Sequence, residues 1–156
     1  MFRQRRGGLN NKPFVILKFR TMRALEDGDE VRQATRKDRR VTAFGAVLRR
    51  TSMDELPQFL NVLRGEMSIV GPRPHALAHD MIYSAALPDY HRRLEVKPGL
   101  TGMAQINGYR GETQELAAMA ARINCDLEYI RRWSFLLDIK LILSTAKVPF
   151  DQRAAY

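Results

Sequence analysis

The stretch TSMDELPQFLNVLRG, residues 51–65, restricts the fold of this chain more than any other, because a proline stands inside a helical pattern. Proline is tolerated only in the first turn of an α-helix, so Pro57 predicts a helix that begins near residues 52–54. Gly65 is a typical stop signal. Apolar residues follow the i, i+3, i+4, i+7 spacing of one helix face: Leu56, Phe59, Leu60 and Leu63.

The other periodicities predict an α+β fold, mostly helical, with a small β-sheet and a single domain. Alternating β-branched and aromatic residues predict a strand over residues 13–22, and a short apolar run predicts a buried strand over residues 67–70. Three segments are predicted as irregular: a charged loop or short solvated helix at 23–40, a turn at 98–102 and a glycine-punctuated loop at 103–111. Helices are predicted at 44–50, at 75–86, over a long segment capped by Thr113, and at 133–148.

The last of these helices is amphipathic, and two placements fit it. It could lie on a membrane surface, or it could pack against the core. Its charges, Asp138, Lys140 and Lys147, argue against a membrane-spanning segment.

Composition narrows the class of partner. The chain has 156 residues, which fits one domain, and its 26 Lys and Arg against 17 Asp and Glu give a formal net charge of +9. Such an excess indicates an anionic partner: nucleic acid, anionic lipid or a phosphorylated substrate. The single cysteine, Cys125, excludes an intrachain disulfide and fits a reducing compartment.

The adjacent carboxylates Asp54 and Glu55 are the leading candidates for chemistry. At a helix N-terminus, free N–H groups and the helix dipole favour the ionised form. An ionised aspartate can attack phosphorus or hold a divalent cation beside phosphate. The alternative is structural, because Ser52 and Glu55 also match the spacing of a capping box.

Cationic side chains supply candidate phosphate contacts. Arg73 is held between two prolines in the GPRP turn, residues 71–74. Its guanidinium could bind phosphate oxygens as a fork of donors, or the turn could be a plain connector whose arginine is solvated. Lys18 and Arg20 continue the face of the predicted strand, either into a cleft or at its exposed end. Arg110 stands in a glycine-rich loop.

His75 and His79 have the i, i+4 spacing of a metal pair, but no HExxH pattern accompanies them.

Five stretches, in this order, resemble bacterial polyprenyl-phosphate hexose-1-phosphate transferases, also called monotopic phosphoglycosyl transferases. They are FRQRRGG, FVILKFRTM, TSMDELPQFLNVLRGEMSIVGPRP, VKPGLTGMAQINGYRGET and DLEYIRRWSFLLDIKLI. The NGYRGET variant is similar to enzymes that start exopolysaccharide or capsule units with glucose. The resemblance identifies residues 1–156 as the catalytic domain, whereas family members carry a re-entrant membrane helix before the FRQRRGG stretch, which is where this chain begins.

The resemblance implies transfer of hexose-1-phosphate from a UDP-sugar to undecaprenyl phosphate, with release of UMP, at the cytoplasmic face of the inner membrane. It implies that Asp54 is the nucleophile and a ligand of Mg²⁺, with Glu55 as acid/base or orienting partner. It places phosphate or substrate contacts at Lys18, Arg49, Arg73, Arg110 and Asp126. The alternative for Asp126 is an i, i+4 ion pair with Arg122.

Two other functions remain open at this stage. Only the net charge supports the interpretation of the chain as a nucleic-acid-binding domain. The sequence contains no recognised nucleic-acid-binding motif and its basic residues are dispersed, so no nucleic-acid partner is expected. A scaffold that binds the membrane or sister proteins without catalysis is less consistent with the intact Asp54–Glu55 pair. The chain could act as a monomer or as a homodimer.

Overall fold

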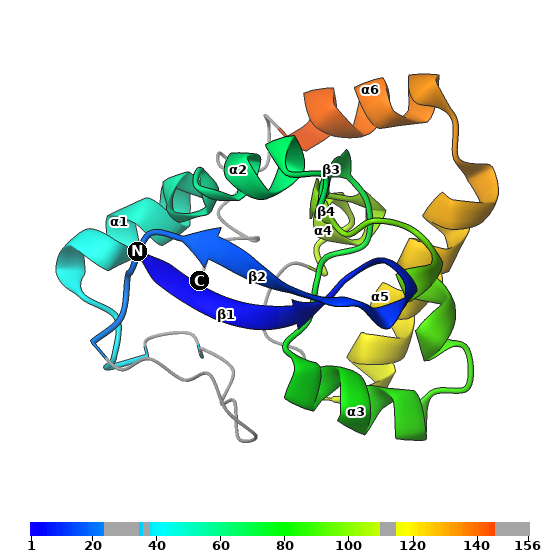
Figure 1. Ribbon diagram of the computed structural model, residues 1–156, viewed down its shortest axis with the longest axis horizontal. Coiled ribbons are helices and arrows are strands. Elements are labelled where there is room, and N and C mark those ends of the chain that lie inside the picture. The colour runs from blue at the N-terminus through cyan, green and yellow to red at the C-terminus, as the bar shows by residue number, and fades with distance from the viewer. Residues whose placement is uncertain (24–34, 36–37, 110–114, 146–156) are drawn as a thin grey trace.

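The computed structural model describes residues 1–23, 35, 38–109 and 115–145. Helices surround two small two-stranded sheets, which confirms the predicted α+β class (Figure 1). None of the helices in these residues is both long enough and apolar enough to cross a membrane.

The first sheet is an antiparallel hairpin. Strand β1 (Phe2–Gly7) pairs with β2 (Pro13–Lys18), and Phe2 lies opposite Lys18. The 3-10 turn η1 (Leu9–Asn11) joins the two strands. Strand β2 confirms the predicted strand but ends at Lys18 rather than at residue 22. No strand was expected at β1, because three of its six residues are arginines and only Gln4 and Gly7 are buried.

The second sheet is parallel and joins distant parts of the chain. Strand β3 (Ser68–Val70) confirms the strand predicted there, and it pairs with β4 (Gly99–Thr101). The turn predicted at 98–102 is therefore wrong. Gly99 approaches the partner strand so closely that a Cβ atom would lie 2.2 Å from the main-chain nitrogen of Gly71. A glycine that reads locally as a turn signal here permits tight strand pairing.

Most predicted helices are present. The loop predicted at 103–111 is wrong over α4 (Met103–Ile106), and residues 110 and 111, like Thr113, lie outside the described residues. The 3-10 segment η3 (Tyr90–Glu95) was not predicted. The four that match predictions are α1 (Ala43–Thr51), α3 (Leu77–Ala86), α5 (Leu116–Arg132) and α6 (Phe135–Thr145).

Among the residues that the structure describes, the apolar core consists of three small clusters, each joining elements that are far apart in sequence. Side chains of the α5 helix contribute to two of them, and Leu141 of α6 contributes to one. The clusters are formed by Phe14, Ile16 and Met67; by Val70, Tyr129 and Leu141; and by Tyr90, Met119 and Ile123.

The segment around Pro57 differs from its prediction. A single helix from residues 52–54 is wrong: a 3-10 turn, η2 (Met53–Glu55), comes first, and α2 (Gln58–Leu63) begins after Pro57. Ser52 has a left-handed backbone with φ 60°, which separates this turn from α1. Gly65, with φ 75°, follows the end of α2 as predicted. Asp54 and Glu55 therefore lie in a 3-10 turn rather than at the start of an α-helix.

The apolar face of this segment points outward. Leu63 is 83% exposed, and Leu56, Phe59 and Leu60 are each about half exposed, at 45–46%. Helix α2 instead buries its polar residues Gln58 and Asn61. Helix α6 is similar, with Leu141 buried while Phe135, Leu136 and Leu143 are exposed. In Figure 1, α1, α2 and α6 lie along one edge of the molecule, and α3 lies on the opposite side.

Asn61 ties α2 to the hairpin. Its side chain is fully buried, its Oδ1 accepts a hydrogen bond from the Leu17 N–H at 3.0 Å, and its Nδ2 donates to the Val15 carbonyl at 2.8 Å. The same Nδ2 donates to Glu66 Oε2 at 2.6 Å. The Asn61 amide thereby bonds main-chain N–H and C=O groups of β2 that a further strand would otherwise pair with.

Asn61→Ala should destabilise the protein by about 3 kcal/mol, because the buried main-chain groups of Leu17 and Val15 lose their partner. Urea unfolding measures this loss. Asn124→Ala, the same substitution at an exposed position of α5, is the matched control and should change stability by less than about 0.5 kcal/mol. Equal effects of the two substitutions would show that Asn61 does not anchor β2.

Candidate active site

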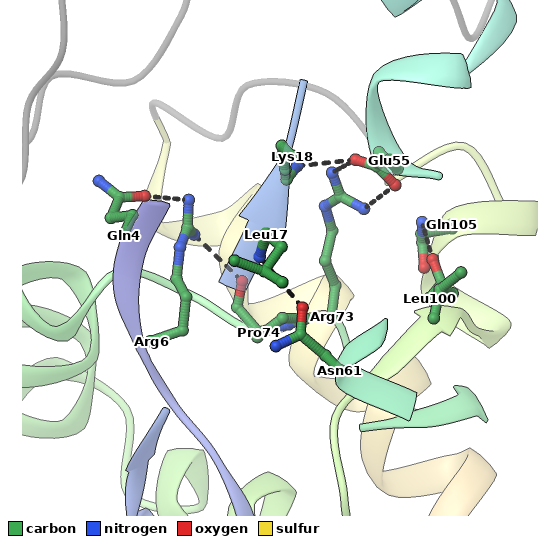
Figure 2. A network of polar contacts seen from close by, with 10 residues as sticks. All are labelled: Gln4, Arg6, Leu17, Lys18, Glu55, Asn61, Arg73, Pro74, Leu100 and Gln105. Carbon is green, nitrogen blue, oxygen red and sulfur yellow. Dashed lines mark hydrogen bonds and ion pairs between the residues drawn. The ribbon is translucent and has the colours of Figure 1, made fainter. Parts of the chain in front are cut away.

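Three segments meet at the candidate site: the end of β2, the turn η2 and the GPRP turn of residues 71–74. Figure 2 shows the side chains of Lys18 and Arg73 pointing at Glu55. Lys18 Nζ lies 2.8 Å from Glu55 Oε1. Arg73 reaches both carboxylate oxygens, with Nη2 at 2.5 Å from Oε1 and Nη1 at 3.3 Å from Oε2. The two cations and the carboxylate predicted from separate stretches thus form one cluster.

Main-chain contacts bring these segments into register. The Phe19 N–H donates to the Asp54 carbonyl at 2.8 Å, so the chain just beyond β2 is fixed to η2. Asn61 holds the same strand through Leu17, as described above. The prediction that Lys18 points into the site is consistent with its side chain being only 16% exposed, whereas Arg20 lies at the surface.

Glu55 is a buried anion that remains ionised. Burial alone would raise its pKa, but Arg73 and Lys18 outweigh this effect and hold the pKa of the carboxyl well below its usual value. Burial in turn lowers the pKa of Lys18, although the charge of Glu55 opposes that shift. Ser52 makes no capping hydrogen bond through its side chain, so the capping-box interpretation of Ser52 and Glu55 is wrong.

Asp54 has a different environment from its neighbour. It is partly buried, and burial raises the pKa of its carboxyl even though the charge of Lys18 opposes the shift. Within residues 1–23, 38–109 and 115–145, its carboxylate makes no hydrogen bond or ion pair. A carboxylate that is desolvated and unengaged is more basic and more nucleophilic than one held by two cations. The pair therefore consists of one engaged and one available carboxylate.

Of the other predicted site residues, Arg49 lies near the carboxylate pair and Asp126 is buried away from it. Arg49 is in the last turn of α1, and its charge acts on Asp54. Arg110 lies outside the described residues. Asp126 is 2% exposed and pairs with Arg93, whose Nη2 lies 2.9 Å from Asp126 Oδ2, so the alternative pair with Arg122 is not its main contact. The Asp126 carboxylate does not open onto the site surface.

His75 belongs to a buried polar network and not to a metal pair. Its Nδ1 lies 2.6 Å from the Tyr90 hydroxyl, which donates to Asp80 Oδ1 at 2.6 Å. Burial, reinforced by the charges of Arg93 and Arg122, holds the pKa of His75 well below its usual value, so the ring stays neutral. Tyr90, Arg93 and Asp80 were not singled out from the sequence, since nothing in their local spacing marks them as partners.

Comparison with known proteins adds independent evidence. The family model described as bacterial sugar transferase matches residues 1–152. A UDP-glucose:undecaprenyl-phosphate glucose-1-phosphate transferase of Caulobacter vibrioides is 57% identical over 156 residues, which is 100% of this chain and 58% of the relative. Proteins of the same name from Xanthomonas campestris pv. campestris and Escherichia coli K12 are 55% and 54% identical.

The chain covers only part of these relatives. It spans 32% of the Xanthomonas protein and 34% of the Escherichia protein, although 99% and 100% of this chain are matched. The match with the family model extends over nearly the whole chain and includes every segment that forms the candidate site. The chain belongs to the bacterial sugar transferase family.

Proposed function

We propose that this chain, residues 1–156, is a catalytic domain that transfers glucose-1-phosphate from UDP-glucose to undecaprenyl phosphate and releases UMP. The observation that carries the proposal is the available Asp54 carboxylate next to the cations Lys18, Arg49 and Arg73. The names of the relatives support the two substrates. The reaction would be the first membrane step in the assembly of an exopolysaccharide, capsule or O-antigen.

The proposed route has two displacements at phosphorus. The Asp54 carboxylate attacks the β-phosphorus of UDP-glucose, the bond from that phosphorus to the UMP oxygen breaks, and an aspartyl phosphosugar forms. A phosphate oxygen of undecaprenyl phosphate then attacks the same phosphorus and releases Asp54. Phosphoryl transfer depends mainly on alignment and charge neutralisation, which Lys18 and Arg73 can provide.

Glu55 has the orienting role in this route. A carboxyl whose pKa lies well below its usual value carries no proton to donate near neutral pH and is a weak base. Its two oxygens instead hold Lys18 and Arg73 beside Asp54. Of the two roles that the family resemblance implies for Glu55, its environment favours the orienting one.

Mg²⁺ is the proposed cofactor, and the site fits it through Asp54. Proteins commonly bind this ion through one or two carboxylates, with substrate phosphates and water completing the shell. Glu55 is already engaged by two cations, and the described residues contain no group of three or more His, Cys, Asp or Glu side chains that could hold a metal. Bound there with the substrate, the ion would neutralise charge on the transferring phosphoryl group.

The exposed apolar side chains of α1, α2 and α6 support a membrane surface as the partner. Phe44 of α1 is 71% exposed, Leu63 of α2 is 83% exposed and Leu136 of α6 is 76% exposed. These three helices lie along one edge of the molecule (Figure 1). Amphipathic helices bury such faces at the boundary of a bilayer. The excess of Lys and Arg favours an anionic leaflet, and we place the domain at the cytoplasmic face of the inner membrane.

Asp54→Asn should lower turnover of UDP-glucose by at least about 10⁴-fold, because the nucleophile is lost. Intact mass spectrometry after incubation with UDP-glucose and Mg²⁺ should show a hexose-phosphate adduct on the wild-type chain and none on the variant. The variant should be at least as stable as the wild type, since the raised pKa means that the ionised Asp54 destabilises the fold near neutral pH.

The matched control is Asp89→Asn, an exposed aspartate in another turn, which should keep both adduct and turnover. An adduct on Asp54→Asn, or turnover close to that of the wild type, would exclude Asp54 as the nucleophile.

Glu55→Gln should lower the free energy of unfolding at pH 7 by about 3 kcal/mol, because Lys18 and Arg73 lose a buried counter-charge. A carboxyl with a depressed folded-state pKa stabilises the fold above its unfolded value and loses that contribution as pH falls through the folded value. The difference between wild type and variant should therefore shrink below pH 4.5. Urea unfolding at several pH values measures it.

Glu128→Gln is the control for this series, because Glu128 pairs with Arg131 and Arg132 at the surface and such pairs contribute little. A constant difference between Glu55→Gln and wild type from pH 7 to pH 3 would show that Glu55 is not held ionised by its neighbours.

Combined Phe44→Ser and Leu63→Ser should weaken binding of the chain to vesicles of anionic phospholipid by at least about tenfold, since two apolar side chains would no longer enter the bilayer. Co-sedimentation measures the affinity. Met81→Ser with Ile82→Ser removes two apolar side chains that are 75% and 61% exposed from α3, the helix on the opposite side, and should leave binding unchanged. Equal loss in both double variants would contradict the proposed orientation.

A further inference from the structure

Arg93 is the largest fully buried side chain described, at 2% exposed, and it comes from η3, outside the candidate site. Its Nε donates to Asp126 Oδ2 at 3.0 Å, and its Nη2 lies 2.9 Å from the same oxygen. The counter-charge of Asp126 offsets the cost of burying this guanidinium. The aromatic ring of Tyr90 lies alongside, with the guanidinium carbon 5.3 Å from the ring centroid.

One donor of Arg93 is directed at the candidate site. Its Nη2 donates to the main-chain carbonyl of Arg73 at 2.5 Å. A buried carbonyl requires a donor, and this one belongs to the residue whose own side chain reaches Glu55. The contact therefore links a deeply buried cation to the backbone that carries a proposed phosphate ligand.

The whole GPRP turn is held through its main chain. The Gly71 N–H donates to the Thr101 carbonyl and the Gly99 N–H donates to the Pro72 carbonyl, both at 2.9 Å, so the start of the turn is bonded to the segment of β4. Side chains bind the other two carbonyls of the turn. Arg93 Nη2 donates to the Arg73 carbonyl. Arg6 Nη1 donates to the Pro74 carbonyl at 3.1 Å (Figure 2).

We propose that Arg93 is a positioning residue, which fixes the main chain of Arg73 so that the Arg73 guanidinium is directed at Glu55 and, during reaction, at the transferring phosphate. The part of this inference that concerns phosphate rests on the proposed function. The part that concerns the Arg73–Glu55 pair does not.

The chemistry of the contact requires arginine. A guanidinium is a rigid fork with five N–H donors, so Arg93 can reach Asp126, the Tyr90 hydroxyl and the Arg73 carbonyl at once. The ammonium of a lysine is a single point with three donors. It can keep the ion pair with Asp126 while losing the carbonyl of Arg73. Arg93→Lys thus preserves the buried charge and tests the geometry.

The first test measures the Arg73–Glu55 pair without substrate. The guanidinium N–H signals of Arg73, followed by NMR in the full chain, should exchange faster with water in Arg93→Lys, because Arg73 is no longer directed at the Glu55 carboxylate. Arg92→Lys, the same change at the exposed neighbouring arginine, should leave the exchange rate of these protons unchanged. An unaltered exchange rate in a folded Arg93→Lys chain would overturn the proposal, whatever reaction the site performs.

The second test is a double-mutant cycle on UMP release from UDP-glucose. Arg93→Lys should lower kcat/KM on the order of 100-fold, as expected for a small misplacement of a group that aligns the substrate. In an Arg73→Ala background the same substitution should cost less than about 2-fold, because the group it positions is already absent. An equal loss in both backgrounds would show that Arg93 acts only on general stability.

A second variant keeps the inference testable if Arg93→Lys does not fold. Asp126→Asn retains the size of the side chain and weakens its hold on Arg93, so it should speed exchange of the Arg73 guanidinium protons and show the same dependence of kcat/KM on Arg73. A folded Asp126→Asn chain with wild-type exchange of these protons and wild-type kcat/KM would overturn the proposal. Absence of turnover in the wild type would instead count against the proposed function and leave the exchange measurement decisive.

Discussion

The structure around the site depends on the burial of one ionised carboxylate. Glu55 could not be removed from water alone, because an unpaired buried charge costs several kcal/mol. Lys18 from the hairpin and Arg73 from the GPRP turn supply the counter-charges. Three segments that are distant in sequence must therefore meet at this point. Asp54, the adjacent residue, is thereby brought near the same two cations, but its carboxyl is not paired with them and its pKa is raised rather than lowered.

Buried polar side chains join many of the elements, whereas the three apolar clusters of the described residues are small. Asn61 replaces a strand along β2, and Arg93 with Asp126 supports the turn that carries Arg73. Polar residues of α2 face inward while its leucines face outward. If the domain lies on a bilayer, as we propose, this apolar face contacts lipid instead of the protein core. The stability of the fold then depends on hydrogen bonds and paired charges among its buried polar side chains.

Local patterns predicted the elements whose signals lie within one segment. The strand at β2, the helices α1, α3, α5 and α6, and the stop at Gly65 follow from periodicity and turn residues. The errors occurred where a distant contact decides the local structure. Gly99 resembles part of a turn but pairs with β3. The helix expected from residues 52–54 is divided into η2 and α2, and the Glu55 of η2 contacts Lys18 and Arg73 from distant segments.

The sequence by itself determined the family resemblance, the α+β class and the residues Asp54, Glu55, Lys18 and Arg73 as candidates, since motif and spacing are properties of a single segment. Only the tertiary structure decided that Glu55 is engaged and Asp54 is available, because the pKa of each depends on burial and on cations from other segments. It also decided that Asp126 pairs with Arg93, 33 residues earlier in the chain, and that the leucines of α2 face outward. Spacing along one helix shows which residues share a face; packing alone shows whether that face is buried.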